Sequence, residues 1–240
     1  MFFNLDVPIL VELNSIVANN QLAAKVFCAV GSNPILRGGP VFFFMAALWF
    51  SGGCKMRRGR MLAGLLAACL ATFLSVSLQH HLVTHIRPFQ DPALHLAHID
   101  AVPEVALPAM TPRLIDSFPS DTATLFFSLA TIIYLEHRMA GSIAFLWSLI
   151  TTGFVRVALG WHYPSDIAGG IILGVAFVYL FTRFQTIETV FERWLQLCER
   201  RIYIVHALLF LFLADAFSLF AGVRGILLLL LAARTSIMKS

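Results

Sequence analysis

The sequence predicts an all-α, polytopic membrane bundle that forms a single domain over residues 1–240. Of the 240 residues, 59% are hydrophobic and only 12% are charged, and the mean hydropathy is +0.82. A soluble domain carries roughly a quarter charged residues, so this composition excludes a soluble protein with a large polar surface. Long apolar runs separated by short basic or polar segments predict about six transmembrane helices behind an amphipathic N-terminal segment.

Residues 1–35 form the first predicted element. This segment is apolar but contains several polar side chains. Such side chains are unfavourable in a helix that faces lipid along its whole length. The pattern favours an amphipathic helix or hairpin at the membrane interface, and a weak first span is the alternative. Because the first six residues carry no basic cluster, a cleaved signal peptide is not expected. The interrupting residues are Glu12, Asn14, Asn19, Asn20 and Lys25.

Apolar runs of about 15 to 20 residues follow, and each predicts a membrane-spanning helix. Residues 183–201 carry apolar side chains at helical spacing with charges between them, so an amphipathic helix on the cytoplasmic side is expected there. The predicted spans are residues 38–52, 61–79, 120–135, 141–159, 164–182 and 202–221.

Basic residues concentrate in the connecting segments 55–60, 136–138 and 183–201. Because basic loops remain in the cytoplasm, these segments share one side of the membrane. The polar segments 80–118 and 156–164 then share the other side and can form a joint site. The net charge of +4 therefore reflects topology and does not indicate a nucleic-acid partner. The four cysteines lack C-x-x-C spacing, so neither a disulfide framework nor a metal site is expected.

The segment 156–166 concentrates charge between two apolar runs. Pro164 suits the first position of a helix, which places His162 just before that helix and Asp166 in its first turn. Asp166 then lies one turn from His162 and can accept an N–H bond from the imidazole. With Arg156 able to grip an anion, this arrangement suits a nucleophile for phosphoryl transfer. A membrane-interface loop with ordinary anchoring residues is the alternative.

Three segments predicted on the same side carry a larger pattern, and they lie within residues 80–170. Together they resemble the type 2 phosphatidic acid phosphatase superfamily of membrane lipid phosphatases, with an undecaprenyl-diphosphatase-like character. The pattern of that family is K-x6-R-P, then P-S-G-H, then S-R-x5-H-x3-D. The matching residues here are Arg87 and Pro88, then Pro119 and Ser120, then Arg156, His162 and Asp166.

The resemblance implies a role for each matching residue. His162 would be the nucleophile that takes the phosphoryl group, and Asp166 would orient it. Arg87 and Arg156 would hold phosphate oxygens, and Ser120 with the free amides after it would complete the phosphate cradle. Neither a metal nor another cofactor is required, because arginines and amides supply the positive field. The structural alternatives are interfacial snorkelling for the arginines and simple N-capping for Ser120.

The sequence departs from the family pattern at four positions. His80 occupies the Lys slot, Asp121 the Gly slot and Val155 the Ser slot, and His80 and Asp121 stay in the predicted phosphate-binding set. Thr122 occupies the slot of the His that acts as general acid in the family. A threonine hydroxyl cannot protonate a leaving oxygen near neutral pH.

The first hypothesis is a substrate whose leaving group needs no proton. A phosphate leaving from a diphosphate has its second pKa at about 6, whereas an alkoxide resembles water, with a pKa of about 15.7. A general acid is worth roughly 10²–10⁴-fold, so its loss impairs monoester cleavage most. This favours a polyprenyl diphosphate, such as the undecaprenyl carrier lipid, at the outer face of a bacterial inner membrane.

Two further hypotheses remain open. A loop histidine can replace the acid, with His85 as the best candidate, and monoester hydrolysis or phosphotransfer to another acceptor then becomes feasible. Alternatively, the protein is not an enzyme and only binds a lipid phosphate. Retention of His162 and Asp166 beside the two arginines argues against a simple binding protein, because binding alone does not need an oriented nucleophile.

Overall fold

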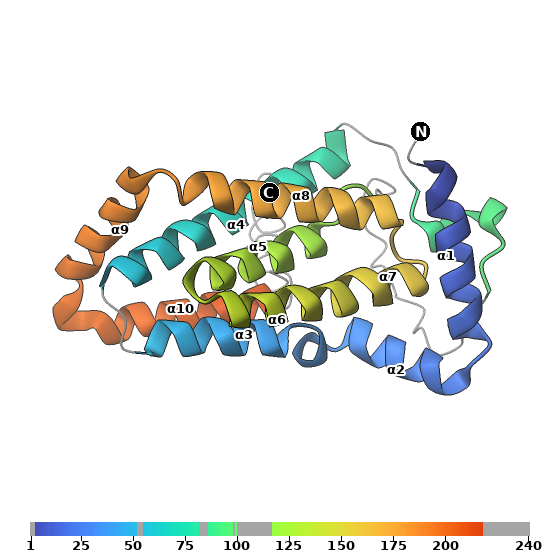
Figure 1. Ribbon diagram of the computed structural model, residues 1–240, viewed down its shortest axis with the longest axis horizontal. Helices are drawn as coiled ribbons and strands as arrows, with labels where there is room; N and C mark the ends of the chain where they lie inside the picture. The colour runs from blue at the N-terminus through green and yellow to red at the C-terminus, as the bar shows by residue number, and fades with distance from the viewer. Residues whose placement is uncertain (1–2, 52–54, 82–85, 98, 100–116, 218–240) are drawn as a thin grey trace, which may run out of the picture. The chain divides into compact units, whose positions relative to one another are not determined.

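The computed structural model describes residues 3–51, 55–81, 86–97, 99 and 117–217 (Figure 1). The described residues are largely α-helical. The α-helices are α1 (Phe3–Ala18), α2 (Gln21–Ser32), α3 (Pro34–Phe50), α4 (Lys55–His81), α5 (Asp121–Glu136), α6 (Arg138–Ser148), α7 (Val155–Ala158), α8 (Pro164–Phe181), α9 (Gln185–Leu197) and α10 (Ile202–Phe217). Shorter helical segments are η1 (Pro88–Gln90), η2 (Pro92–Leu94), the π-helical η4 (Leu149–Phe154) and η5 (Glu199–Arg201).

The chain divides into two compact units, residues 1–194 and 195–240. The first unit contains helices α1 to α8 and most of α9. In the second unit the described part ends in α10, a 16-residue helix of almost entirely apolar side chains. The prediction of a single domain over residues 1–240 stays a prediction.

Three helical segments are long and apolar enough to cross a membrane: Lys55–Gln79, Arg138–Ala158 and Pro164–Phe181. The second runs continuously through α6, η4 and α7. Helix α3 is apolar but shorter, and it begins at Pro34, four residues before the predicted start. Helix α8 begins at the predicted Pro164. The predicted all-α membrane class is confirmed to this extent.

Helix α5 lies at the centre of the first unit, in contact with α3, α4, α6 and α8. Every residue from 122 to 133 is buried, so this helix is enclosed on all sides. Its polar side chains do not need outside partners, because hydroxyls such as those of Thr124, Ser128 and Thr131 donate to the carbonyl four residues earlier.

Glycines allow α8 to approach α5 closely. A Cβ on Gly170 would lie 2.6 Å from the Ser120 carbonyl oxygen, and one on Gly174 would lie 2.5 Å from that of Thr124. Only residues without a side chain fit at this separation. Gly170 and Gly174 therefore allow the two helices to approach closely, and the contact brings the starts of α5 and α8 together.

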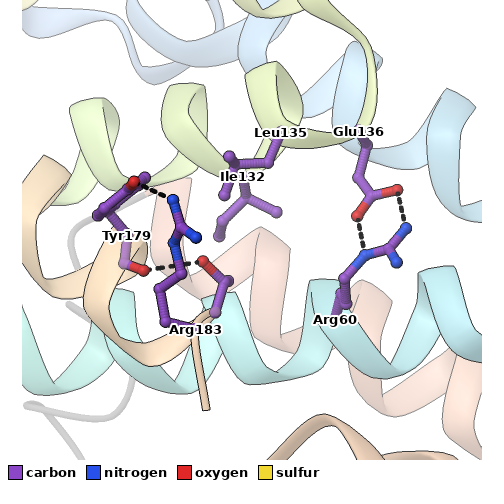
Figure 2. Close-up of a pocket in the computed structure, with 7 residues that line it drawn as sticks. Arg60, Ile132, Leu135, Glu136, Tyr179 and Arg183 are labelled. Atoms are coloured by element: carbon purple, nitrogen blue, oxygen red, sulfur yellow. Dashed lines mark hydrogen bonds and ion pairs between the residues drawn. The ribbon is translucent and has the colours of Figure 1, made fainter. Parts of the chain in front are cut away.

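The basic segment 55–60 corrects one prediction, because it forms the first turns of α4 and is not a loop. The arginine side chains of this helical segment have hydrogen-bond partners. Arg60 donates two hydrogen bonds to Glu136, of 2.9 and 3.1 Å, and Arg58 donates one to the Trp49 carbonyl. Figure 2 shows Arg60, Glu136 and Arg183 around a cavity of about 290 Å³. Arg60, Glu136 and Arg183, one from each predicted basic segment, therefore lie at the same end of the first unit.

Helices α1 and α2 form the predicted N-terminal hairpin and pack against α7. In Figure 1, α1 lies across the end of the bundle at the start of α8. Asn14 is buried, donates to the Ala158 carbonyl at 3.2 Å and accepts from the Ala97 amide at 2.9 Å. Asp6 accepts from the Ser165 amide at 3.1 Å, in the first turn of α8. These polar residues attach the hairpin to the bundle and are not simply an interfacial pattern.

Candidate functional site

The site lies where α5 and α8 begin and α7 ends, at the end of the bundle opposite Arg60 and Glu136. The Ser120 amide donates to the Asp166 carbonyl at 3.0 Å, which couples the two helix starts directly. Ser75 and Gln79 of α4 donate to the Pro119 carbonyl at 3.0 and 2.6 Å. The segment before α5 is therefore held by two neighbouring helices.

Pro164 and Asp166 shape the start of α8 as predicted. Pro164 occupies the first turn, where its missing N–H costs nothing. Oδ2 of Asp166 accepts the Tyr163 amide at 2.8 Å, which caps the helix. His162 lies immediately before this cap and is fully buried. Its position is thus set by local chain geometry.

The ring of His162 contacts a different group at each nitrogen. Nδ1 lies 3.3 Å from Oδ2 of Asp166, and Nε2 lies 3.1 Å from Nη2 of Arg156 and 3.4 Å from Oγ of Ser120. A guanidinium has only donors, so Nε2 must accept, and the proton resides on Nδ1 and is donated to Asp166. The Nε2 lone pair therefore faces the groups predicted to hold the phosphate.

Burial gives His162 a neutral ground state. Burial is the main cause that lowers the pKa of His162 to about 4, and the charges of Arg156 and Arg87 lower it further, against the opposing contributions of Asp166. An imidazole with this pKa is unprotonated near neutral pH. It can therefore act as a nucleophile without first losing a proton.

Ser117 is a site residue that sequence reasoning missed. It is buried, its hydroxyl donates to Oδ2 of Asp166, and its Oγ lies 3.3 Å from Nδ1 of His162. Ser117 therefore helps to orient the Asp166 carboxylate, which in turn accepts the N–H of His162. Ser117 lies two residues before Pro119, in the segment that carries the second motif, and this position was the sequence feature that could have indicated a role in the site.

Arg156 and Arg87 are the two predicted phosphate-binding arginines. The guanidinium of Arg156 lies over the Trp161 ring at 5.3 Å, and it follows the π-helical turn η4, a type of irregularity frequent at functional sites. The Phe89 amide donates to the Gly160 carbonyl at 2.9 Å, which joins the segment of Arg87 to the loop before His162. Among the described residues, the buried Nε atoms of both arginines have no hydrogen-bond partner.

Asp121 and Thr122 occupy the first turn of α5. Oδ1 of Asp121 accepts from the Thr122 amide at 2.6 Å and from its hydroxyl at 3.2 Å. Asp121 interacts electrostatically with Arg156 and Arg87, so it acts as their counter-ion. Thr122 is fully buried and turns its hydroxyl to Asp121. The side chain of His80 and the whole of His85, the predicted substitute acid, lie outside the described residues.

Arg37 of α3 is a further residue that the sequence analysis did not assign. It is buried, and it interacts electrostatically with Asp121 and Arg156. Its signal in the sequence was an isolated positive charge in an apolar stretch, which is uncommon and usually functional.

The residues that form this site lie largely within a region that matches a known protein family. The sequence pattern of the PAP2 superfamily matches residues 60–189, which include most of α4, all of α5 to α8 and most residues of the candidate site. The chain belongs to the PAP2 superfamily. Arg37 lies before the matched region.

Three curated proteins are similar to this PAP2 chain. The undecaprenyl-diphosphatase BcrC of Bacillus subtilis is 26% identical over 141 residues, which are 58% of this chain and 65% of the relative. The putative undecaprenyl-diphosphatase YbjG of Escherichia coli is 30% identical over 129 residues, 53% of this chain and 58% of the relative. The bacitracin transport permease protein BcrC of Bacillus licheniformis is 44% identical over 62 residues, 25% of this chain and 29% of the relative.

The aligned region thus spans less than two thirds of the length of each of these relatives. No solved structure matches the chain significantly. The comparisons establish the PAP2 family, and the contacts described above define how this chain arranges its own residues.

Proposed function

We propose that the protein is a membrane lipid phosphatase that removes the terminal phosphate of a polyprenyl diphosphate through a phosphohistidine. The observation that carries this proposal is the environment of Nε2 of His162. A neutral, buried imidazole presents its lone pair 3.1 Å from a guanidinium, while Asp166 receives its other N–H. A nucleophile beside an anion-binding cation is the arrangement that phosphoryl transfer needs.

In the first step, the terminal phosphate replaces the contact between Arg156 and His162. Arg156 and Arg87 take phosphate oxygens, and the Ser120 hydroxyl adds a further donor. The Thr122 and Ala123 amides of α5, which the sequence pattern left free for the phosphate, are instead bonded to the side chains of Asp121 and Ser120. Nε2 of His162 attacks phosphorus as the bond to the bridging oxygen breaks. The bridging oxygen leaves on the lipid monophosphate with its electron pair, so no proton is required. Asp166 stabilises the positive charge of the phosphorylated ring.

In the second step, water attacks the phosphorus of the phosphohistidine. The P–N bond breaks, and its electron pair returns to Nε2 of His162. The water oxygen and both its hydrogens leave in inorganic phosphate. The ring regains the tautomer with the proton on Nδ1, because Asp166 has kept that proton in place throughout.

The choice of a diphosphate is supported by Thr122 and by the relatives. The Thr122 hydroxyl is buried and bonded to Asp121, so this position offers no acid for a basic alkoxide. A lipid monophosphate leaves without help, because its second pKa is about 6. Two of the similar proteins carry undecaprenyl-diphosphatase in their names. Undecaprenyl diphosphate is accordingly the substrate that we propose.

The topology that we propose has about six spans in a bacterial inner membrane, with the site facing outward. The motif-bearing core and the remaining helices would form one domain over residues 1–240. Single cysteines at His95, near the site end, and at Arg138, at the basic end, test this in a background without native cysteines. We expect a membrane-impermeant maleimide to label position 95 in intact cells and position 138 only after lysis. The reverse pattern would invert the topology.

The activity is tested by phosphate release from purified protein in detergent, with a polyprenyl diphosphate and the matching monophosphate as substrates. We expect release from the diphosphate and its loss in His162→Asn. His137→Asn is the matched control, because His137 caps α6 at the other end and asparagine also caps helices. Hydrolysis that survives in His162→Asn would exclude the phosphohistidine mechanism. No release from either lipid by the native protein would exclude hydrolysis of these substrates.

A further inference from the structure

Helix α1 buries one face against the end of the first unit that carries the site (Figure 1). The face consists of residues three or four positions apart, which lie on one side of a helix. They are Asp6, Leu10, Asn14 and Val17, and each is at most 5% exposed. The helix lies before residues 60–189, which match the PAP2 pattern. The family pattern therefore does not explain why two of these buried residues are polar.

Asp6 caps the helix that follows His162. The first amides of a helix have no partner within that helix. In α8, Asp166 accepts the Tyr163 amide at 2.8 Å. Asp6 accepts the Ser165 amide at 3.1 Å, and a carboxylate at this position is also favoured by the helix dipole. The start of α8 thus depends on a side chain 159 residues away in the sequence, bound next to Asp166.

Leu10 joins α1 to three helices that carry site residues. It is fully buried, in one apolar cluster with residues of α5, α7 and α8. Two leucines of the segment 86–97 pack against the same cluster. Apolar packing thus fixes the helix against the site end, and it holds the polar side chains of this face in defined positions. The cluster contains Leu10, Ala123, Phe127, Val157 and Ile167, with Leu94 and Leu96 packed against it.

Asn14 connects the two chain segments that carry the proposed phosphate-binding arginines. Its amide nitrogen donates to the Ala158 carbonyl at 3.2 Å, and its amide oxygen accepts from the Ala97 amide at 2.9 Å. Ala158 is the last residue of α7, two residues after Arg156. Ala97 lies at the end of the described segment that contains Arg87. One buried side chain therefore ties the backbones of both segments together.

We infer that α1 is a positioning element of the site, in which Asp6 orients the nucleophile and Asn14 holds the arginines. This inference rests on the proposed function. Asp6 fixes the turn of α8 that presents Asp166 to Nδ1 of His162, so its loss slows the chemical step. Asn14 fixes the backbones that carry the two arginines, so its loss weakens substrate binding. The two residues therefore affect different kinetic constants, whereas a helix that only stabilised the fold would affect both constants in the same way.

Asp6→Ala removes the acceptor of the Ser165 amide. Misplacement of a reacting group by about 1 Å can cost roughly 100-fold in rate. We therefore expect kcat for a polyprenyl diphosphate to fall about 10-fold to 100-fold, with KM changed less than about threefold. Asp6→Asn should recover most of kcat, because an amide oxygen also accepts from Ser165. Glu12→Ala is the control, since Glu12 is an exposed carboxylate on the same helix, and it should have native kinetics.

Asn14→Ala removes both hydrogen bonds that tie the arginine segments together. We expect KM for the diphosphate to rise about 10-fold, because the arginines lose their fixed places, with kcat changed less than about threefold. The same substitution at Asn19, which is exposed, is the control and should have native kinetics. Equal changes of kcat and KM in Asp6→Ala and Asn14→Ala would show that α1 only stabilises the fold, and they would overturn the inference.

Nitrogen NMR of isotope-labelled histidine tests the role of Asp6 without turnover. The signals of the His162 ring are those missing from His162→Asn. We expect these signals to shift in Asp6→Ala and to return in Asp6→Asn. Unchanged signals in a folded Asp6→Ala protein would overturn the role of Asp6, even if lipid hydrolysis is confirmed.

Binding of the diphosphate to the inactive His162→Asn protein is the matching test for Asn14. In this background, Asn14→Ala should weaken binding about 10-fold, and Asp6→Ala should leave it within about threefold. An unchanged affinity in Asn14→Ala would overturn its role. If melting temperatures show that Asp6→Ala does not fold, Asn14→Ala decides the inference, because it retains the hydrogen bond between Asp6 and Ser165. Absence of hydrolysis by the native protein, with the NMR and binding results as expected, would reject the proposed function alone.

Discussion

Nη2 of Arg156 lies 3.1 Å from Nε2 of His162, so a permanent donor faces the nitrogen that we propose as nucleophile. This contact determines the tautomer of the ring, because a guanidinium cannot accept a hydrogen bond. It also keeps the lone pair directed to the place where a phosphate must bind. The free protein thus holds the proposed nucleophile and the proposed anion-binding group in contact.

Asp166→Asn tests the orientation of the histidine. The asparagine amide can donate to Nδ1, which would favour the tautomer with the proton on Nε2 and remove the lone pair from the phosphate side. We expect kcat for the diphosphate to fall on the order of 10²–10⁴-fold, with a small change in KM. Asp6→Asn is the control, because Asp6 is also buried and an amide oxygen can still accept from Ser165. Equal losses in the two variants would show that the effect is structural.

The pKa of His162 predicts how stability depends on pH. An unfolded histidine titrates near 6.5, whereas burial lowers the pKa of His162 in the folded protein to about 4. The unfolded state therefore binds more protons between these values, so stability is fully present above pH 6.5 and decreases as pH falls towards 4, by about 3 kcal/mol. We expect the melting temperature in detergent to fall less over this range in His162→Asn. Parallel curves for the two proteins would contradict the shifted pKa.

Gly170→Ala tests the coupling of the two helix starts. The added Cβ would meet the Ser120 carbonyl at 2.6 Å, so α5 and α8 must separate, and Ser120 must move away from His162. Displacement of about 1 Å can cost roughly 100-fold in rate, and we expect a loss of kcat of that order. Gly39→Ala is the control, because its Cβ would meet only Ile35 at 3.7 Å. A Gly170→Ala protein with native kinetics would show that the contact does not position the site.

Thr122→His tests the argument about the leaving group. It restores the type of residue that donates a proton in the family pattern, so we expect monophosphate hydrolysis to rise by about 10-fold or more, with a much smaller change for the diphosphate. Because Thr122 is fully buried, the larger ring can strain the start of α5. Melting temperatures must therefore accompany the rates. Equal increases for both substrates would contradict the leaving-group argument.

Much of the site is set by residues close together in the sequence. Pro164 is suited to the first turn of a helix, and α8 begins there. The three residues between His162 and Asp166 then place the carboxylate one helical turn from the ring, beside it. The spacing of the third motif was therefore enough to predict the bond that the structure contains. The basic segments were likewise enough to predict that the described parts of the two polar segments lie together, and the Phe89 amide does donate to the Gly160 carbonyl.

The remaining site residues depend on distant partners. Arg37 interacts electrostatically with Asp121 and Arg156 because α3 packs against α5 and η4. The Asp6 side chain bonds to Ser165 across most of the chain. Ser117 becomes a partner of Asp166 only when the starts of α5 and α8 are held together at Gly170. A sequence pattern shows the spacing of residues within one helix. It does not show which buried charges on different helices pair with one another.

The sequence by itself determined the membrane class, the order of the main helices and the local geometry of the third motif, because hydropathy and local helix geometry act over short distances along the chain. The tertiary structure decided the tautomer of His162, the bond from Ser117 to Asp166 and the electrostatic interaction of Arg37 with Asp121. These depend on side-chain contacts between helices, where burial makes each hydrogen bond and charge pair strong enough to select one arrangement.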